Sequence, residues 1–164
     1  MLSINTFKRF TAAFCSIYIF LISIIPVFAG DSTYKFNMSY IYFGDTGTYI
    51  SKVDSTRNSL DEISPSYFDL NDDGALQLTK AVDCNFINEM HKRGIKVVPF
   101  LSNHWDREKG RKALALRNNL ALQIADAVRK YGLDGVNVDI ENLTEEDRDT
   151  YTDFVRLLKE KMPE

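Results

Sequence analysis

Residues 133–143 read Leu-Asp-Gly-Val-Asn-Val-Asp-Ile-Glu-Asn-Leu. Apolar and polar side chains alternate along this stretch, which predicts a β-strand over residues 135–140. On such a strand Asn137, Asp139 and Glu141 share one face, and the Val and Ile residues between them point into a helix layer. One buried strand is therefore expected to present three polar side chains on the same side.

Two of these side chains are carboxylates, and their position points to chemistry. Burying Asp139 beside Glu141 is costly unless the groups are hydrogen-bonded or used. A glycosidase uses such a pair, because one carboxyl group must stay protonated while its neighbour stays ionised. Glu141 also lies at the carboxyl end of its strand, the rim where barrel active sites are built. The alternative is a solvated strand end or a helix-capping pair.

Strands and helices alternate around this stretch. The apolar patterns predict strands over residues 36–43, 95–101 and 135–140 and a weaker strand around residues 66–68, within 63–70. They predict helices over residues 82–92, 108–131 and 144–162. This order favours a parallel sheet, in either a doubly wound open sheet or a barrel of eight strand-helix units. No Gly-x-Gly-x-x-Gly turn follows the first strand, which argues against a nucleotide-binding open sheet.

The first 29 residues have the pattern of a secretory signal. They contain no Asp or Glu, and Lys8 and Arg9 precede an apolar run that ends Val-Phe-Ala. We expect cleavage after Ala29 and a protein that is secreted, extracellular or in the cell wall. The alternative is an uncleaved membrane anchor, because about twenty apolar residues can cross a bilayer.

The remaining residues, 30–164, carry 18 Lys and Arg against 23 Asp and Glu, a formal charge of −5. This charge argues against nucleic-acid binding. Their single cysteine, Cys84, cannot form an internal disulfide, and we expect it on the buried stripe of a helix.

The pattern Asp134-Gly135-x-x-x-Asp139-x-Glu141 resembles the fourth-strand signature of glycoside hydrolase family 18, the chitinase-like family. The form seen here is most similar to the bacterial peptidoglycan-cleaving branch, which includes spore cortex-lytic N-acetylglucosaminidases. Residues 95–103 and the aromatic residues 40–43 are similar to the family's third and first strands. The resemblance covers residues 36–163.

The resemblance implies a (β/α)8 TIM barrel and a retaining reaction assisted by the substrate's acetamido group. Glu141 would be the general acid/base, and Asp139 would orient and stabilise the acetamido group. Asn137 would be a supporting polar neighbour, at a position where many chitinases have Asp. Asp134 has the opposite strand parity and is interpreted as structural. The resemblance implies no cofactor and no metal.

Three weaker patterns have two interpretations each. Tyr42 and Trp105 are candidates for stacking on a sugar, or for packing in the core and on the rim. The run Asp69-x-Asn71-x-Asp73-Gly74 begins like a calcium loop, but its twelfth position is Lys80, which favours a plain turn.

An eight-unit barrel takes about 250 residues, so residues 30–164 are expected to form a partial catalytic domain of about four units. Open sheet edges would favour self-association. The predicted function is hydrolysis of β-1,4 bonds in N-acetylglucosamine-containing glycans, peptidoglycan or chitin. The alternatives are a non-catalytic glycan-binding protein and an inactive truncated fragment.

Overall fold

The computed structural model describes residues 34–162. The chain divides into two units, Met1–Lys35 and Phe36–Glu164, and the second unit contains the fold. The predicted signal over residues 1–29 lies outside the described residues, so its cleavage stays a prediction. Within residues 34–162, no helix has both the length and the apolar character needed to cross a membrane.

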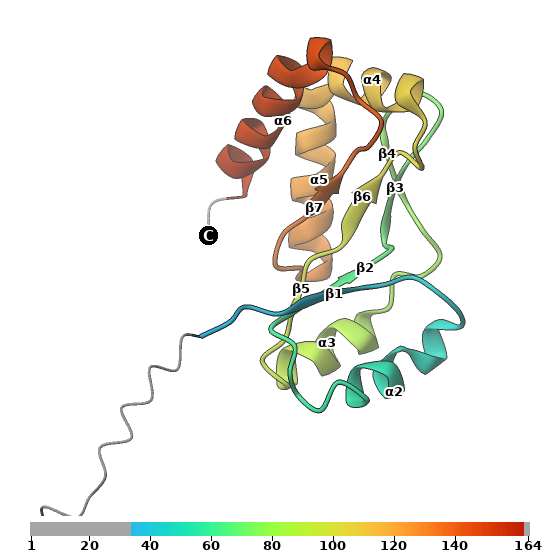
Figure 1. Ribbon diagram of the computed structural model, residues 1–164, viewed down its shortest axis with the longest axis vertical. Coiled ribbons are helices and arrows are strands. Elements are labelled where there is room, and N and C mark those ends of the chain that lie inside the picture. The colour runs from blue at the N-terminus through green and yellow to red at the C-terminus, as the bar shows by residue number, and fades with distance from the viewer. Residues whose placement is uncertain (1–33, 163–164) are drawn as a thin grey trace, which may run out of the picture. The chain divides into compact units, whose positions relative to one another are not determined.

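The described chain contains a predominantly parallel sheet in two parts. The strands are β1 (Met38–Ile41), β2 (Glu62–Pro65), β3 (Phe68–Leu70), β4 (Leu76–Leu78), β5 (Lys96–Val97), β6 (Phe100–Ser102) and β7 (Asn137–Asp139). One part has the order β1-β2-β5 and the other β4-β3-β6-β7; all pairs are parallel except β3–β4 (Figure 1). β2 continues into β3 and β5 into β6, so the four predicted strands lie in chain order.

Prolines explain why two of these strands are split. Pro65 ends β2 and Pro99 separates β5 from β6, and proline has no N–H to give to a ladder. Hydrogen bonds across the breaks keep the segments aligned: Val98 N donates to Ile63 O at 3.0 Å, and Asn137 N donates to Pro99 O at 2.9 Å. The strand predicted over 95–101 is therefore present as two consecutive short pieces. The weaker strand predicted around 66–68 was placed wrongly, because Ser66 and Tyr67 lie between β2 and β3.

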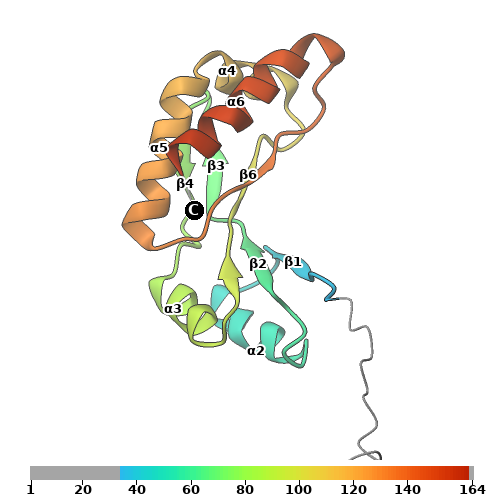
Figure 2. The same ribbon diagram turned by 90° about the vertical axis from the view of Figure 1, so that its left-hand side faces the viewer.

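The helices form two groups beside the sheet. Their bounds are α2 (Tyr49–Asp54), α3 (Cys84–Lys92), α4 (Arg107–Ala115), α5 (Arg117–Tyr131) and α6 (Arg148–Lys161), with 3-10 turns η1 (Thr46–Thr48) and η2 (Glu145–Asp147). α2 and α3 lie beside β1, β2 and β5, whereas α4, α5 and α6 lie beside β3, β6 and β7 (Figures 1 and 2). The core contains the most deeply buried side chains of both groups, among them Tyr49, Phe86, Met90, Leu120, Ile124 and Phe154.

Cys84 is exposed, so the expectation that it lies on the buried stripe of its helix is wrong. Asp83 caps α3 by accepting hydrogen bonds from the backbone N–H groups of residues 85 and 86, which makes Cys84 the first helical residue. The buried stripe then consists of Phe86, Ile87 and Met90. Helical geometry turns Cys84 away from that stripe.

The helix predicted over residues 108–131 is two helices. The backbone of Leu116 (φ −98°, ψ 15°) leaves the helical path between α4 and α5. Beyond the break, Arg117 Nε donates to Asp153 Oδ2 on α6 at 2.5 Å, and α5 packs along α6. No Gly or Pro marks this break in the sequence, so tertiary packing overrides helix propensity here. The predicted end at residue 131 is confirmed: α5 ends at Tyr131, and the Gly132 that follows is left-handed at φ 64°.

Two elements, α2 and β4, were absent from the sequence predictions. α2 has six residues and buries Tyr49 and Val53, four positions apart. β4 has three residues and pairs antiparallel with β3. Both are too short for a period of 3.6 or 2 to stand out in the sequence.

An ion-pair network attaches the start of α6 to α4. Thr144 and Asp147 form a capping box, in which each side chain bonds the other's backbone. Asp147 also accepts from Arg111 Nε at 2.9 Å. The bond to Arg111, followed by the Thr144 backbone N–H, lowers the pKa of Asp147 to about 2.

This lowered pKa predicts how stability depends on pH. A carboxyl group whose pKa falls on folding stabilises the folded state fully above its unfolded pKa of about 3.9. That contribution disappears as the pH falls through the folded value of about 2. The urea concentration at the unfolding midpoint decreases as the pH falls between these values. We expect this decrease to be less steep in Asp147→Asn than in the parent. Asp149→Asn, at a carboxylate that is 95% exposed, is the control; equal slopes in the two variants would contradict the assignment.

The turn between β3 and β4 contacts α4 so closely that Gly74 has no room for a side chain. Gly74 has φ +82°, and a Cβ there would lie 2.5 Å from Ala113 N. Gly94 has a similar φ of +73° but nothing within 4 Å. We expect Gly94→Ala to lower the free energy of unfolding by about 1 kcal/mol from backbone strain alone. Gly74→Ala is expected to cost about 3 kcal/mol, because overpacking adds to the strain. Urea unfolding measures both, and equal losses would contradict the packing argument.

Candidate active site

A cavity of about 620 Å³ lies at the carboxyl ends of the parallel strands. Its polar lining comes from Ser66, Asp69, Thr79, Ser102, His104, Asp139 and Glu141, and its apolar and aromatic lining from Tyr40, Tyr42, Phe68, Phe100 and Trp105. The strands of a barrel fold present their active-site residues at this end. The cavity therefore combines carboxylates with aromatic surface at the expected edge of the sheet.

Asp139 and Glu141 both line this cavity, as the alternation along their strand predicted. Val136 and Val138 line a separate hollow of about 990 Å³ on the helix side of β7, together with residues of α5 and α6. That hollow is larger, but it adjoins the amino end of β7 and the last turn of α6. The two carboxylates place the candidate site in the smaller cavity.

The carboxylates are less enclosed than the sequence suggested. Asp139 is partly buried and Glu141 is exposed in the described chain. Expecting two buried carboxylates was therefore wrong, because β7 is the outermost strand of its sheet and the cavity opens beside it. A substrate has direct access to the Glu141 carboxyl group.

Asn137 faces the same side, but its partner is on another strand. Its Nδ2 donates to the Tyr40 hydroxyl on β1 at 3.1 Å. Asn137 does not line the cavity, whereas Tyr40 does. The role of Asn137 in this structure is to hold a tyrosine of the cavity wall.

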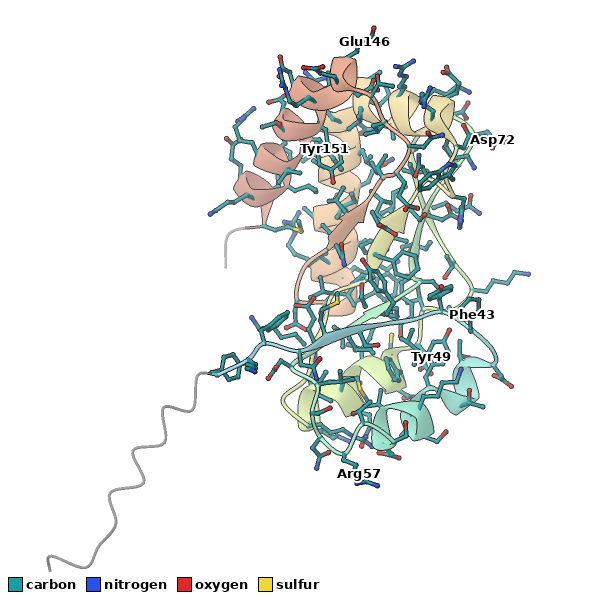
Figure 3. All side chains as sticks on the ribbon, in the orientation of Figure 1. Phe43, Tyr49, Arg57, Asp72, Glu146 and Tyr151 are labelled. Atoms are coloured by element: carbon teal, nitrogen blue, oxygen red, sulfur yellow. The ribbon has the colours of Figure 1, made fainter. Side chains whose placement is uncertain are left out.

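Asp139 also affects a side chain behind the strand. Tyr151 projects from α6 towards β7 (Figure 3), and its hydroxyl donates to Val138 O at 3.2 Å. Burial and, secondarily, the negative charge of Asp139 raise the pKa of Tyr151. Tyr151 therefore stays a neutral hydrogen-bond donor at neutral pH.

The aromatic residues form one wall of the cavity. The Tyr40 and Phe100 rings meet edge to face with centroids 5.3 Å apart, and Tyr42 meets Phe100 in the same way at 5.9 Å. Tyr42 is 49% exposed and Trp105 is 63% exposed. Both sequence candidates therefore line the cavity with accessible ring surface.

A side-chain contact between Asp69 and His104 was not predicted. His104 Nε2 lies 3.0 Å from Asp69 Oδ2, across the rim of the cavity. The signals in the sequence were weak: Asp69 ends a predicted strand, and His104 follows another. Tyr40 was a stronger missed candidate, because it lies two positions from Tyr42 on the same strand face.

The calcium-like run is a turn. Asn71 Oδ1 accepts from the backbone N–H groups of Asp73 and Ala75 at 3.0 and 2.9 Å. Within residues 34–162, no three His, Cys, Asp or Glu side chains come together in a way that could hold a metal ion.

Comparisons with known proteins agree with this geometry. The model of the family Glycosyl hydrolases family 18 matches residues 38–164. No curated protein sequence matched the chain.

The Bacillus cereus spore cortex-lytic enzyme SleL is similar in structure, with 21% identity and a TM-score of 0.63 over 77% of this chain and 31% of that chain. A Bacteroides thetaiotaomicron chitinase has 22% identity and a TM-score of 0.63, over 77% of this chain and 42% of its own. A Chromobacterium violaceum chitinase has 17% identity and a TM-score of 0.66, over 78% and 42%.

This chain thus spans less than half the length of each of these solved structures. Their similarity, together with the family match, identifies the fold as that of the (β/α)8 barrel, of which the described residues form four strand-helix units. The chain belongs to glycosyl hydrolase family 18.

Proposed function

We propose that this protein hydrolyses β-1,4 bonds in N-acetylglucosamine-containing glycans and that Glu141 is the general acid/base. One observation carries the proposal: Asp139 and Glu141 line the same cavity at the carboxyl end of β7 in a family 18 chain. A carboxyl group that is accessible at this edge can reach a glycosidic oxygen.

In the proposed reaction, Glu141 gives a proton to the oxygen of the leaving sugar. The oxygen of the substrate's 2-acetamido group attacks the anomeric carbon, as in substrate-assisted glycosidases. Asp139, two residues earlier on the same face, orients this group and stabilises its positive charge. Glu141 then removes a proton from the water that opens the cyclic intermediate. The amide of Asn137 supports the site through the Tyr40 hydroxyl.

We assign the sugar-binding surface to Tyr42 and Trp105. Aromatic faces stack on the C–H surfaces of sugars, and both rings are about half exposed or more. The cavity also contains a third carboxylate, Asp69, paired with His104. Peptidoglycan, including spore cortex, and chitin both supply N-acetylglucosamine, so both are candidate substrates.

We also propose export by the predicted signal over residues 1–29, which would bring the protein to extracellular or cell-wall glycans.

One observation favours a second candidate function. The chain spans 31% to 42% of the length of the solved structures described above. A non-catalytic glycan-binding protein, an inactive fragment, or a chain that self-associates through its open sheet would each fit this length.

The test is mass spectrometry of products released from N-acetylglucosamine oligomers and from purified peptidoglycan, with the chain made with and without residues 1–29. We expect Glu141→Gln to reduce the cleavage rate by about 10²- to 10⁴-fold, because it removes the proton donor. Glu145→Gln, at a carboxylate that is 86% exposed and absent from the cavity lining, is the matched control. Circular dichroism confirms folding. No release by the folded parent, or equal rates in parent and Glu141→Gln, would reject the proposed catalysis.

A further inference from the structure

The backbone pairing of β6 and β7 stops at Asp139, two residues before Glu141. The side chain of Asn103 continues the pairing. The last paired residues are Ser102 and Asp139. Beyond them, Glu141 N donates to Asn103 Oδ1 at 2.8 Å, and Asn103 Nδ2 donates to Glu141 O at 3.0 Å. The Asn103 amide therefore takes the place of a neighbouring strand and binds both backbone polar groups of Glu141.

The backbone after Asn103 does not form these hydrogen bonds with Glu141, because it turns away from β7. His104 and Trp105 both have positive φ angles, 50° and 65°. Consecutive left-handed residues other than glycine are strained and need support from their surroundings. Asn103 provides part of it, because its Nδ2 also donates to Asp106 O at 2.8 Å. The same amide closes the loop over residues 103–106 and holds Glu141.

The loop after β7 is attached to this loop at a second point. Asn142 Nδ2 donates to Trp105 O at 2.9 Å. Arg107 Nε donates to Asn142 O at 2.6 Å. Glu141 therefore lies between Asp139, which pairs with Ser102, and Asn142, which these two hydrogen bonds hold. Its backbone has little freedom.

Gly110 on α4 leaves the space that the Asn103 side chain occupies. A Cβ at this position would lie 2.9 Å from Asn103 Nδ2 and 3.0 Å from Ile140 Cγ2. Asn103 is completely buried. A side chain at position 110 would therefore press on the amide that binds Glu141.

Among residues 34–162, no hydrogen bond to the Glu141 carboxylate itself is present. The hydrogen bonds that hold Glu141 are those of its backbone, and they fix the point from which its side chain starts. We propose that Asn103, held against Gly110, is a positioning residue that fixes the backbone of Glu141 and so aims its carboxyl group into the cavity. This proposal rests on the proposed role of Glu141 as the acid.

The kinetic test compares Asn103→Ala and Gly110→Ala with the parent chain. Displacing a catalytic group by about 1 Å can cost about 100-fold in rate, so we expect kcat to fall about 10- to 100-fold in Asn103→Ala with KM within about twofold. Gly110→Ala keeps Asn103, but the added methyl group pushes the Asn103 amide. We expect it to lower kcat by a smaller factor than Asn103→Ala does. Alanine is the better helix former, so this variant tests positioning even if Asn103→Ala does not fold.

Asn71→Ala is the matched control. Asn71 also binds backbone N–H groups through its amide, but in the turn between β3 and β4 and outside the cavity lining. We expect it to keep the parent's kcat. If folded Asn103→Ala, or Gly110→Ala where Asn103→Ala is unfolded, keeps the parent's kcat, the proposal is overturned.

Amide hydrogen exchange of Glu141, followed by NMR, gives a readout that needs no activity. We expect the Glu141 amide to exchange at least about tenfold faster in Asn103→Ala, or in Gly110→Ala, than in the parent and in Asn71→Ala. If the parent shows no hydrolysis, the proposed function fails, and exchange alone decides on the positioning role. Unchanged exchange at Glu141 would overturn that role, whether or not the chain is active.

Discussion

The parallel register of β6 and β7 is the constraint on which the site depends. It aligns Ser102 with Asp139 and brings the carboxyl ends of both strands to one edge. A slip of one residue would turn Asp139 and Glu141 to the helix side and bring Val138 into the cavity. Asp134 fixes the register before β7 begins: its N–H donates to Val97 O at 3.0 Å, and its carboxylate accepts from Val97 N at 2.7 Å.

The same register leaves the second edge of β7 facing away from β6. Asn137 N donates to the O of Pro99, the residue just before β6, so the polar groups of the next residue, Val138, point to the opposite edge. At that edge the Tyr151 hydroxyl donates a hydrogen bond to the Val138 carbonyl oxygen. α6 therefore supplies one hydrogen bond to an edge that a closed barrel would pair.

Elements with a strong local pattern could be predicted from the sequence. The strand with Asn137, Asp139 and Glu141 alternates cleanly, and the helix with Phe86, Ile87 and Met90 has a clear apolar stripe. The break at Leu116 has no local signal, because helix formers lie on both sides and the contact between Arg117 and Asp153 is made 36 residues apart. The exposure of Cys84 follows from the angular spacing along α3, which places Phe86, Ile87 and Met90 on the buried face and Cys84 outside it.

The site shows the same division between pattern and context. Asp139 and Glu141 could be found because strand parity and a known signature both mark them. Asn103 could not, because its function depends on hydrogen bonds to a residue 38 positions away and on the missing side chain of Gly110. An asparagine after a strand is typical of many ordinary turns. What distinguishes this one is complete burial with both amide hydrogens used, and burial depends on three elements meeting at one point.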